Sequence, residues 1–141
     1  MGRQTAFLSH SHKDRVMAKG VQAFLQSQGW DVYIDWEDAE MPERPNRQTA
    51  ARIKDKIVQL DWFLFLATQT STASRWCPWE IGYADGKKNI DRIIILPTSD
   101  GYSTYGSEYL DLYRHFWPST LGDIRVFGPD RTSVALRDMR R

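Results

Sequence analysis

Residues 74–80 (SRWCPWE) place a carboxylate among indole rings, a pattern that can do chemistry on a charged aromatic ligand. Trp76 and Glu80 are four positions apart, so they are neighbours on one face of a helix. Indoles beside one carboxylate form an apolar wall, suited to stacking on bases, around a single negative charge. A carboxylate fixed in a partly dry pocket stabilises the oxocarbenium-like state through which an N-glycosidic bond breaks. We therefore predict that Glu80 is catalytic and that Trp76 contacts the ligand. The simpler interpretations are a solvated helix glutamate and a core tryptophan.

Polar and aromatic side chains in the first third of the chain are further candidates for ligand binding. Asp35 ends an expected strand and could hold a ribose, while Trp36 could stack on a base. Arg47 could meet a phosphate, although a charged loop residue is more often only solvated. Ser9 and Ser11 lie where a helix N-terminus would hold phosphate, although local capping explains them equally well. We predict that all five contribute to substrate binding.

The histidines and the cysteine give a weak case for a metal. His10 and His12 are two positions apart, and only His115 remains elsewhere, so a zinc site is not expected. We instead expect His10 and His12 to be loop histidines that support the site, with His10 contributing to substrate binding. Cys77 is the only cysteine, which rules out an intrachain disulfide and fits a reducing cytoplasm. Its tryptophan neighbours favour a buried, inert thiol over a nucleophile.

Composition narrows the class of protein and its partners. The chain has 141 residues, the size of one domain, and 41% of them are hydrophobic, which is typical of a globular protein. With 19 basic and 18 acidic side chains the net charge is +1, so the sequence lacks the basic excess expected for nucleic-acid binding. The apolar runs fall far short of the about 20 residues that span a membrane. A soluble, cytoplasmic protein is expected, with no membrane partner and no signal peptide.

Short apolar runs alternate with amphipathic stretches along the chain. Strands are expected at 6–8, 30–35, 62–67, 92–96 and 123–127, the last of them at an edge. Helices are expected at about 13–28, ended by Gly29, at 47–60, through Glu80 to about Gly86, at 107–116 and at 132–141. Residues 38–46 and 100–106 are expected to be loops.

This alternation predicts an α/β fold, a flavodoxin-like doubly wound domain with a five-stranded parallel sheet flanked by helices. Sites in such folds lie at the carboxyl ends of the strands. That rule gathers residues 9–14, 35–47, 68–80 and 97–101 at one edge of the sheet, and with them every candidate named above.

Three ordered motifs give the chain a resemblance to bacterial TIR (Toll/interleukin-1 receptor) domains. Residues 7–14 (FLSHSHKD) resemble the first-strand box of the family, where SH-S-x-K-D is a common form. Residues 29–35 (GWDVYID) resemble its second strand, and 74–80 its S-x-W-C-x-x-E helix. Order and spacing agree over roughly residues 5–128, so the chain is expected to be a single TIR domain over residues 1–141.

The resemblance implies an activity. Many TIR domains with a glutamate at the position of Glu80 cleave the nicotinamide–ribose bond of NAD, as substrate and without a separate cofactor. Some bacterial members cyclise the ADP-ribose or transfer it to an acceptor, and the product signals phage infection to a partner effector in Thoeris-type defence. The family also implies self-association through TIR–TIR contacts, with the 35–47 loop of one subunit near the site of another. That loop, with Trp36, Pro42 and Pro45, departs from the standard pattern.

Other functions stay open from the sequence. A non-catalytic TIR scaffold would explain the fold but not a carboxylate at Glu80 beside Trp76. A nucleoside deoxyribosyltransferase would also use a glutamate in a similar sheet, as a covalent nucleophile. A phospho-receiver is disfavoured, since the first strand ends in Ser9 and His10 and not in an acidic pair. A flavodoxin is compatible with the fold alone.

Overall fold

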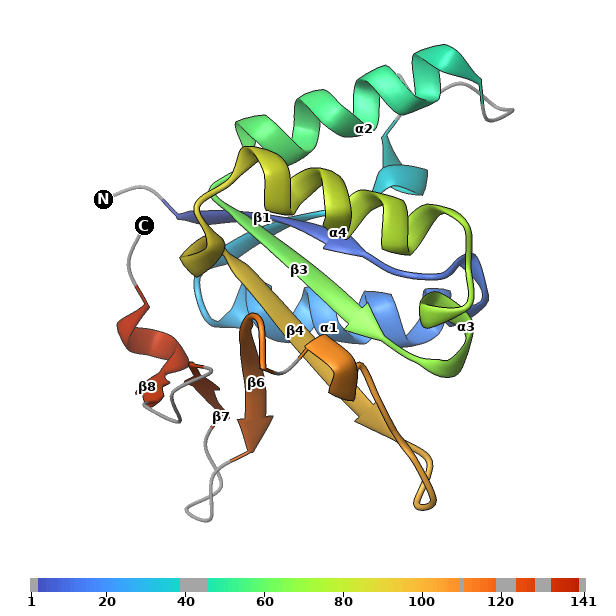
Figure 1. The fold of residues 1–141 in the computed structure, drawn as a ribbon. Helices are drawn as coiled ribbons and strands as arrows, with labels where there is room; N and C mark the ends of the chain where they lie inside the picture. The colour runs from blue at the N-terminus through green and yellow to red at the C-terminus, as the bar shows by residue number, and fades with distance from the viewer. Residues whose placement is uncertain (1–2, 39–45, 110, 119–123, 129–132, 140–141) are drawn as a thin grey trace.

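The fold is a curled, mostly parallel sheet between two layers of helices, as a computed structural model of the chain shows (Figure 1). The structure describes residues 3–38, 46–109, 111–118, 124–128 and 133–139. The strands run β2-β1-β3-β4-β6-β7-β8, and β5 pairs with β4 alone. The pairs from β2 to β6 are parallel, whereas β7 and β8 are antiparallel additions. The strands are β1 (Gln4–Ser9), β2 (Trp30–Tyr33), β3 (Trp62–Ala67), β4 (Ile93–Ser99), β5 (Thr104–Tyr105), β6 (Arg114–Pro118), β7 (Ile124–Phe127) and β8 (Ser133–Ala135).

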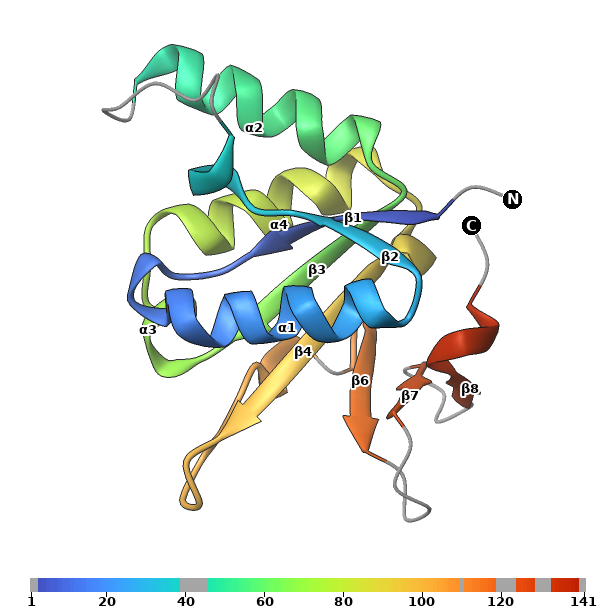
Figure 2. The same cartoon turned by 180° about the vertical axis from the view of Figure 1, so that it is seen from behind.

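Helices cover both faces of the sheet, which confirms the doubly wound prediction. They are α1 (Arg15–Ser27), α2 (Arg47–Gln59), the short α3 (Gln69–Thr72) and α4 (Trp76–Lys87). Helix α1 covers one face, and α2 and α4 cover the other (Figures 1 and 2). Alternate residues of each central strand point to opposite faces. In β3, for example, Leu64 packs in the cluster with α1, whereas Phe63 and Phe65 pack in the cluster with α2 and α4.

Local sequence signals fix where the helices begin and end. Asn46 and Thr49 form a reciprocal capping box at the start of α2, which satisfies two backbone N–H groups. Helix α1 ends at Ser27, and Gly29 follows with a positive φ of 92°, a conformation that glycine adopts without strain. Within the described residues, no helix is long and apolar enough to cross a membrane.

The C-terminal third differs from the sequence prediction. The expected helix at 107–116 is wrong: Ser107–Tyr109 form one 3-10 turn, and the chain then enters β6. Pairing with β4, through Ile94↔Arg114 and Ile95↔His115, makes β6 the fifth parallel strand. Strand β7 is therefore antiparallel and lies between β6 and β8, not at the edge.

The other local differences are smaller. Instead of a helix over 132–141, the described residues form β8 and a 3-10 turn at Leu136–Asp138. The expected loop 100–106 contains β5, and β4 continues through Pro97 to Ser99. Most of the expected loop 38–46, with Pro42 and Pro45, lies outside the described residues.

Gly106 sits where the chain returns from β5 to pack against the sheet. Its φ is +87°, and a Cβ built there would lie 2.5 Å from the Cβ of Ala67 and 3.3 Å from Cγ2 of Ile95. Real Cβ atoms do not approach carbon that closely, so the backbone here reaches the end of β3 only because the residue lacks a side chain.

Candidate active site

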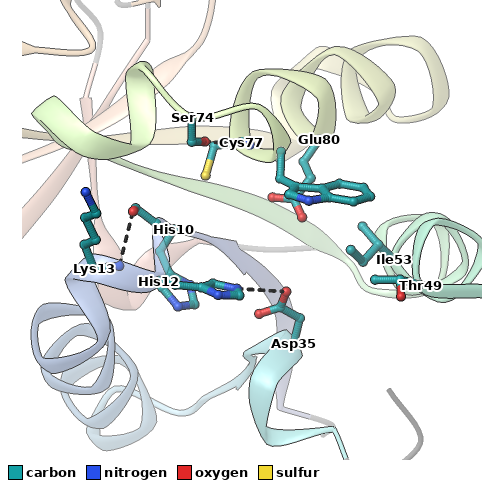
Figure 3. Close-up of a pocket in the computed structure, with 11 residues that line it drawn as sticks. His10, His12, Lys13, Asp35, Thr49, Ile53, Ser74, Cys77 and Glu80 are labelled. Carbon is teal, nitrogen blue, oxygen red and sulfur yellow. Dashed lines mark hydrogen bonds and ion pairs between the residues drawn. The ribbon is translucent and has the colours of Figure 1, made fainter. Parts of the chain in front are cut away.

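A cavity of about 270 Å³ opens at the carboxyl end of β1, between the loop that follows it, the turn after β2, and helices α2 and α4 (Figure 3). This is the edge of the sheet where doubly wound folds hold their ligands. It is lined by His10, Ser11, His12, Lys13, Asp35, Thr49, Ile53, Ser74, Trp76, Cys77 and Glu80.

Glu80 is a buried carboxylate in the wall of this cavity, with 4% of its surface exposed. The Ser9 hydroxyl donates a hydrogen bond of 2.7 Å to its Oε1. Among the described residues, no lysine, arginine or histidine forms an ion pair with it. Burial raises the pKa of Glu80 to about 8, and the negative charge of Asp35 adds to this, whereas the Ser9 hydrogen bond opposes it. A carboxyl group in this position can pair with a positive charge on a bound ligand.

The start of α4 positions Glu80. The backbone N–H of Cys77 donates to Ser74 Oγ at 3.1 Å, which fixes the first turn of the helix. Pro78 is the third helical residue, where its missing N–H costs nothing. Glu80 follows in the second turn, where its carboxylate accepts the hydrogen bond from Ser9 at the end of β1.

Asp35 and His12 face Glu80 from the other side of the cavity (Figure 3). His12 Nε2 lies 4.0 Å from Asp35 Oδ2. Asp35 opens a 3-10 turn at Asp35–Glu37, directly after β2. Asp14 holds the loop that carries His12, because its Oδ2 accepts hydrogen bonds from Thr68 Oγ1 at 2.6 Å and Thr70 Oγ1 at 2.8 Å.

His10 lines the cavity, but both of its ring nitrogens are engaged. Trp36 Nε1–H donates to His10 Nε2 at 2.8 Å, so that nitrogen is the acceptor. His10 Nδ1 then carries the hydrogen and donates it to Leu8 O at 3.3 Å. Burial lowers the pKa of His10. His10 can therefore line the cavity, but neither of its ring nitrogens is free to accept a further proton or to bind a metal.

Trp36 lies outside the cavity lining, unlike the stacking residue that we expected. Its ring packs against the α1 side of the sheet, with the guanidinium of Arg15 5.1 Å and the ammonium of Lys19 6.0 Å from the ring centroid. Trp36 contributes to the site indirectly, because its hydrogen bond holds the His10 ring in one orientation. A direct contact between Trp36 and a bound base stays a prediction, and this geometry does not favour it.

We expect Trp36→Phe to lower the free energy of unfolding by about 1–3 kcal/mol, because His10 Nε2 loses its donor while it stays buried. Unfolding in denaturant measures this change. Trp117→Phe on β6 is the matched control: Trp117 is exposed, so its loss of the indole N–H should cost less than about 0.5 kcal/mol. Equal, small effects of both substitutions would show that the Trp36–His10 hydrogen bond contributes nothing.

The sequence offers two interpretations of Trp76, a residue that contacts the ligand or a core residue. It lines the cavity, yet 38% of its surface is exposed, and its ring packs edge-on against Trp79 with centroids 5.2 Å apart. It is therefore not a core residue. The exposed ring surface beside the cavity is available to a ligand, and contact between Trp76 and a ligand stays a prediction.

The remaining candidates are placed as follows. Ser9 holds Glu80 and is itself buried, so it acts on the carboxylate and does not line the cavity. Ser11 lines the cavity and its Oγ accepts from the N–H of Lys13 at 3.2 Å, which is the local capping alternative. Arg47 is the first residue of α2, is exposed, and does not line the cavity.

Sequence reasoning missed several lining residues. Lys13 lines the cavity although the sequence predicts no role for it, whereas His12, expected to support the site as a loop histidine, lines the cavity as well. Thr49 and Ile53 are four apart on α2, a spacing that predicts only a shared face and not a ligand site. Cys77 was expected to be inert; burial raises the pKa of its thiol to about 11. Among the described residues, no group of three or more His, Cys, Asp or Glu could hold a metal.

Fold and site together define a doubly wound domain with a carboxylate pocket at the strand ends, and comparison places it in a family. The family model for the TIR domain matches residues 6–121, and the chain belongs to that family. A curated relative from Bacillus cereus (strain MSX-D12), named "Probable 3' cyclic ADP-D-ribose synthase ThsB'", is 32% identical over 118 residues. The match covers 82% of this chain and 61% of the relative, so the chain spans less than two thirds of the relative's length.

Two solved structures share the fold. A 2-deoxyribosyltransferase from Bacillus psychrosaccharolyticus superposes with a TM-score of 0.58 at 13% identity, over 80% of this chain and 85% of the other. The Clostridium botulinum CMP N-glycosidase BcmB gives a TM-score of 0.51 at 22% identity, over 71% of this chain and 75% of the other. At these identities the likeness concerns the architecture alone.

Proposed function

We propose that this TIR domain is an NAD-consuming enzyme that cleaves the bond between nicotinamide and ribose. The observation that carries the proposal is Glu80, a buried carboxylate without a cationic partner among the described residues, in a cavity beside the exposed ring surface of Trp76. The name of the Bacillus cereus relative, a probable cyclic ADP-ribose synthase, supports the same class of substrate.

The chemistry follows from charge. Nicotinamide bound to ribose is a cation, and a cation beside Glu80 favours the ionised carboxylate over the protonated form that burial favours. When the glycosidic bond breaks, its electron pair leaves with the nicotinamide nitrogen and positive charge moves to the ribose. The buried Glu80 carboxylate, held by Ser9, stabilises that charge. Capture of the ribosyl cation by water gives ADP-ribose, capture by a hydroxyl of the same molecule gives a cyclic isomer, and capture by another acceptor gives a conjugate.

The biological setting that we propose is antiphage defence. NAD serves as substrate with no separate cofactor, and the product is an immune signal read by a downstream effector, as the resemblance to Thoeris-type proteins suggests. Chemical analysis of the reaction would identify the product, and the product would then identify the effector that binds it.

Incubation of the purified protein with NAD, followed by liquid chromatography and mass spectrometry, tests the activity. We expect wild type to release nicotinamide and the companion product to name the reaction. A glycosyl adduct on Glu80 with deoxynucleosides as substrates would instead indicate a deoxyribosyltransferase. No turnover of either substrate, even when copies of the domain are forced together, would leave a scaffold.

We also propose that activity depends on self-association. The resemblance to the family implies that the 35–47 loop of one subunit lies near the site of another. We expect nicotinamide release per molecule of protein to rise with protein concentration. Measurement of rate over a hundredfold range of protein concentration tests this, and a rate strictly proportional to concentration throughout would contradict it.

A further inference from the structure

We propose that His12, oriented by Asp35, is the general base that removes a proton from the hydroxyl group that captures the ribosyl cation. This inference rests on the proposed function and adds the second half of the reaction to it. Glu80 serves bond breaking, and the pair of His12 and Asp35 serves bond formation.

The placement of the pair suits this task. His12 lines the cavity on the wall that faces Glu80, and 64% of its side chain is exposed (Figure 3). It can therefore exchange its proton with water, and an acceptor that enters from the open side meets it. Asp35 is more buried, with 22% of its side chain exposed, and its Oδ2 lies 4.0 Å from His12 Nε2. A carboxylate beside one imidazole nitrogen orients the ring and leaves the other nitrogen to act as base. Such contacts are often long before the substrate binds.

Three other titratable groups of the described lining are unsuited to the role. Both nitrogens of His10 are engaged by Trp36 and Leu8, so that ring cannot accept a proton. The Cys77 thiol, whose pKa burial raises to about 11, stays protonated near neutral pH. The Lys13 ammonium has no lone pair to offer. A neutral imidazole, in contrast, has a nitrogen lone pair that can accept a proton, and His12 has one nitrogen free of any partner that the structure describes.

The step balances as follows. The bond between C1 of the ribose and the nicotinamide nitrogen breaks, and the electron pair leaves with nicotinamide, which is then neutral. The acceptor oxygen donates an electron pair to C1 and forms the new C–O bond. The proton of that hydroxyl moves to the free nitrogen of His12, and the Asp35 carboxylate stabilises the imidazolium. Water as acceptor follows the same course, and the proton returns to solvent through the exposed side of His12.

A pyridine base provides the discriminating probe. Its ring nitrogen carries no proton, so capture of the ribosyl cation by pyridine nitrogen exchanges one base for another without general-base help. Capture by water or a ribose hydroxyl must release a proton. The two routes share Glu80 and bond breaking, and they differ only in the step that we assign to His12.

The experiment incubates NAD with a fixed excess of 3-acetylpyridine and measures both products, the exchanged dinucleotide and the product of hydroxyl capture, for each variant. We expect His12→Gln to raise the ratio of exchange to hydroxyl capture about a hundredfold, because a general base contributes about 10²–10⁴-fold. Asp35→Asn should raise the ratio less, since it removes only the orienting partner. Asp55→Asn, the same change at an exposed position on α2, should leave the ratio unchanged.

The ratio separates this inference from the proposed function. If His12→Gln lowers both routes equally, or lowers neither, His12 is not the base and the inference is overturned while the enzyme assignment stands. If wild type forms neither product, also when its copies are forced together, the proposed function fails and this inference fails with it. Formation of the exchanged dinucleotide by His12→Gln also shows that the variant is folded.

Discussion

Glu80→Gln is expected to lower nicotinamide release by at least 10²–10³-fold, the scale on which a single preorganised electrostatic group acts. Glutamine has nearly the same shape and can still accept from Ser9, so the cavity should persist. What is lost is the ability to become negative when a cationic ring binds and when charge reaches the ribose. Product formation from NAD, followed by mass spectrometry, measures the effect.

The same substitution is expected to stabilise the protein at alkaline pH. The pKa of Glu80 in the folded protein is about 8, against an ordinary value of 4.5. The folded state therefore binds the proton more tightly than the unfolded state, and stability falls as pH rises from about 4.5 to 8. Glutamine removes this dependence, so at pH 8.5 the free energy of unfolding of the variant should exceed that of wild type by on the order of 5 kcal/mol. Thermal melting of both proteins between pH 5 and 8.5 tests the sign.

Glu108→Gln is the matched control for both effects. Glu108 is exposed and does not line the cavity, so this variant should keep wild-type turnover and the wild-type dependence of melting on pH. An active Glu80→Gln protein would contradict the proposed function. An inactive one that melts like wild type at every pH would show that Glu80 is ionised in the folded, empty site.

Gly106→Ala is expected to cost about 2–5 kcal/mol of stability. Positive φ costs an alanine roughly 1–2 kcal/mol, and its Cβ would collide with the Ala67 Cβ at 2.5 Å, an overpacking that costs about 1–3 kcal/mol more. Neither atom is the end of a flexible side chain, so the strand or the turn must move. Unfolding in denaturant measures the loss.

Gly101→Ala separates the two causes. Gly101 has a similar φ of +93°, but a Cβ there would meet nothing within 4 Å. It should therefore cost only the conformational part, about 1–2 kcal/mol. Equal losses at the two positions would mean that the chain relieves the contact with Ala67 at no cost.

The core of the fold could be predicted because its signals are local. The run WFLFLA is apolar at every position and became β3 with the predicted bounds, since a central parallel strand is buried on both faces. Residues 107–116 misled because their aromatic residues recur at helical spacing. The pairing of β6 with β4, a contact between segments about twenty residues apart, overrides that spacing, and no local pattern encodes it.

The candidate site also has features that the sequence predicts and features that depend on tertiary packing. The rule that sites lie at the carboxyl ends of strands brought Ser9, Asp35 and Glu80 together correctly. The orientation of Trp36 could not be read from the sequence, because which side of the sheet an indole packs on depends on Arg15 and Lys19 of α1. For the same reason, the contrast between an engaged His10 and an open His12 appears only in three dimensions.

Every described residue that lines the cavity lies between His10 and Glu80, although β4 to β8 supply much of the sheet. The chain is thus divided into a chemical part and a supporting part. Substitutions of exposed residues on the supporting strands would change none of the side chains that line the pocket. A fluorescent or affinity label joined beyond β8 would likewise be attached to the part of the molecule that supplies none of these side chains.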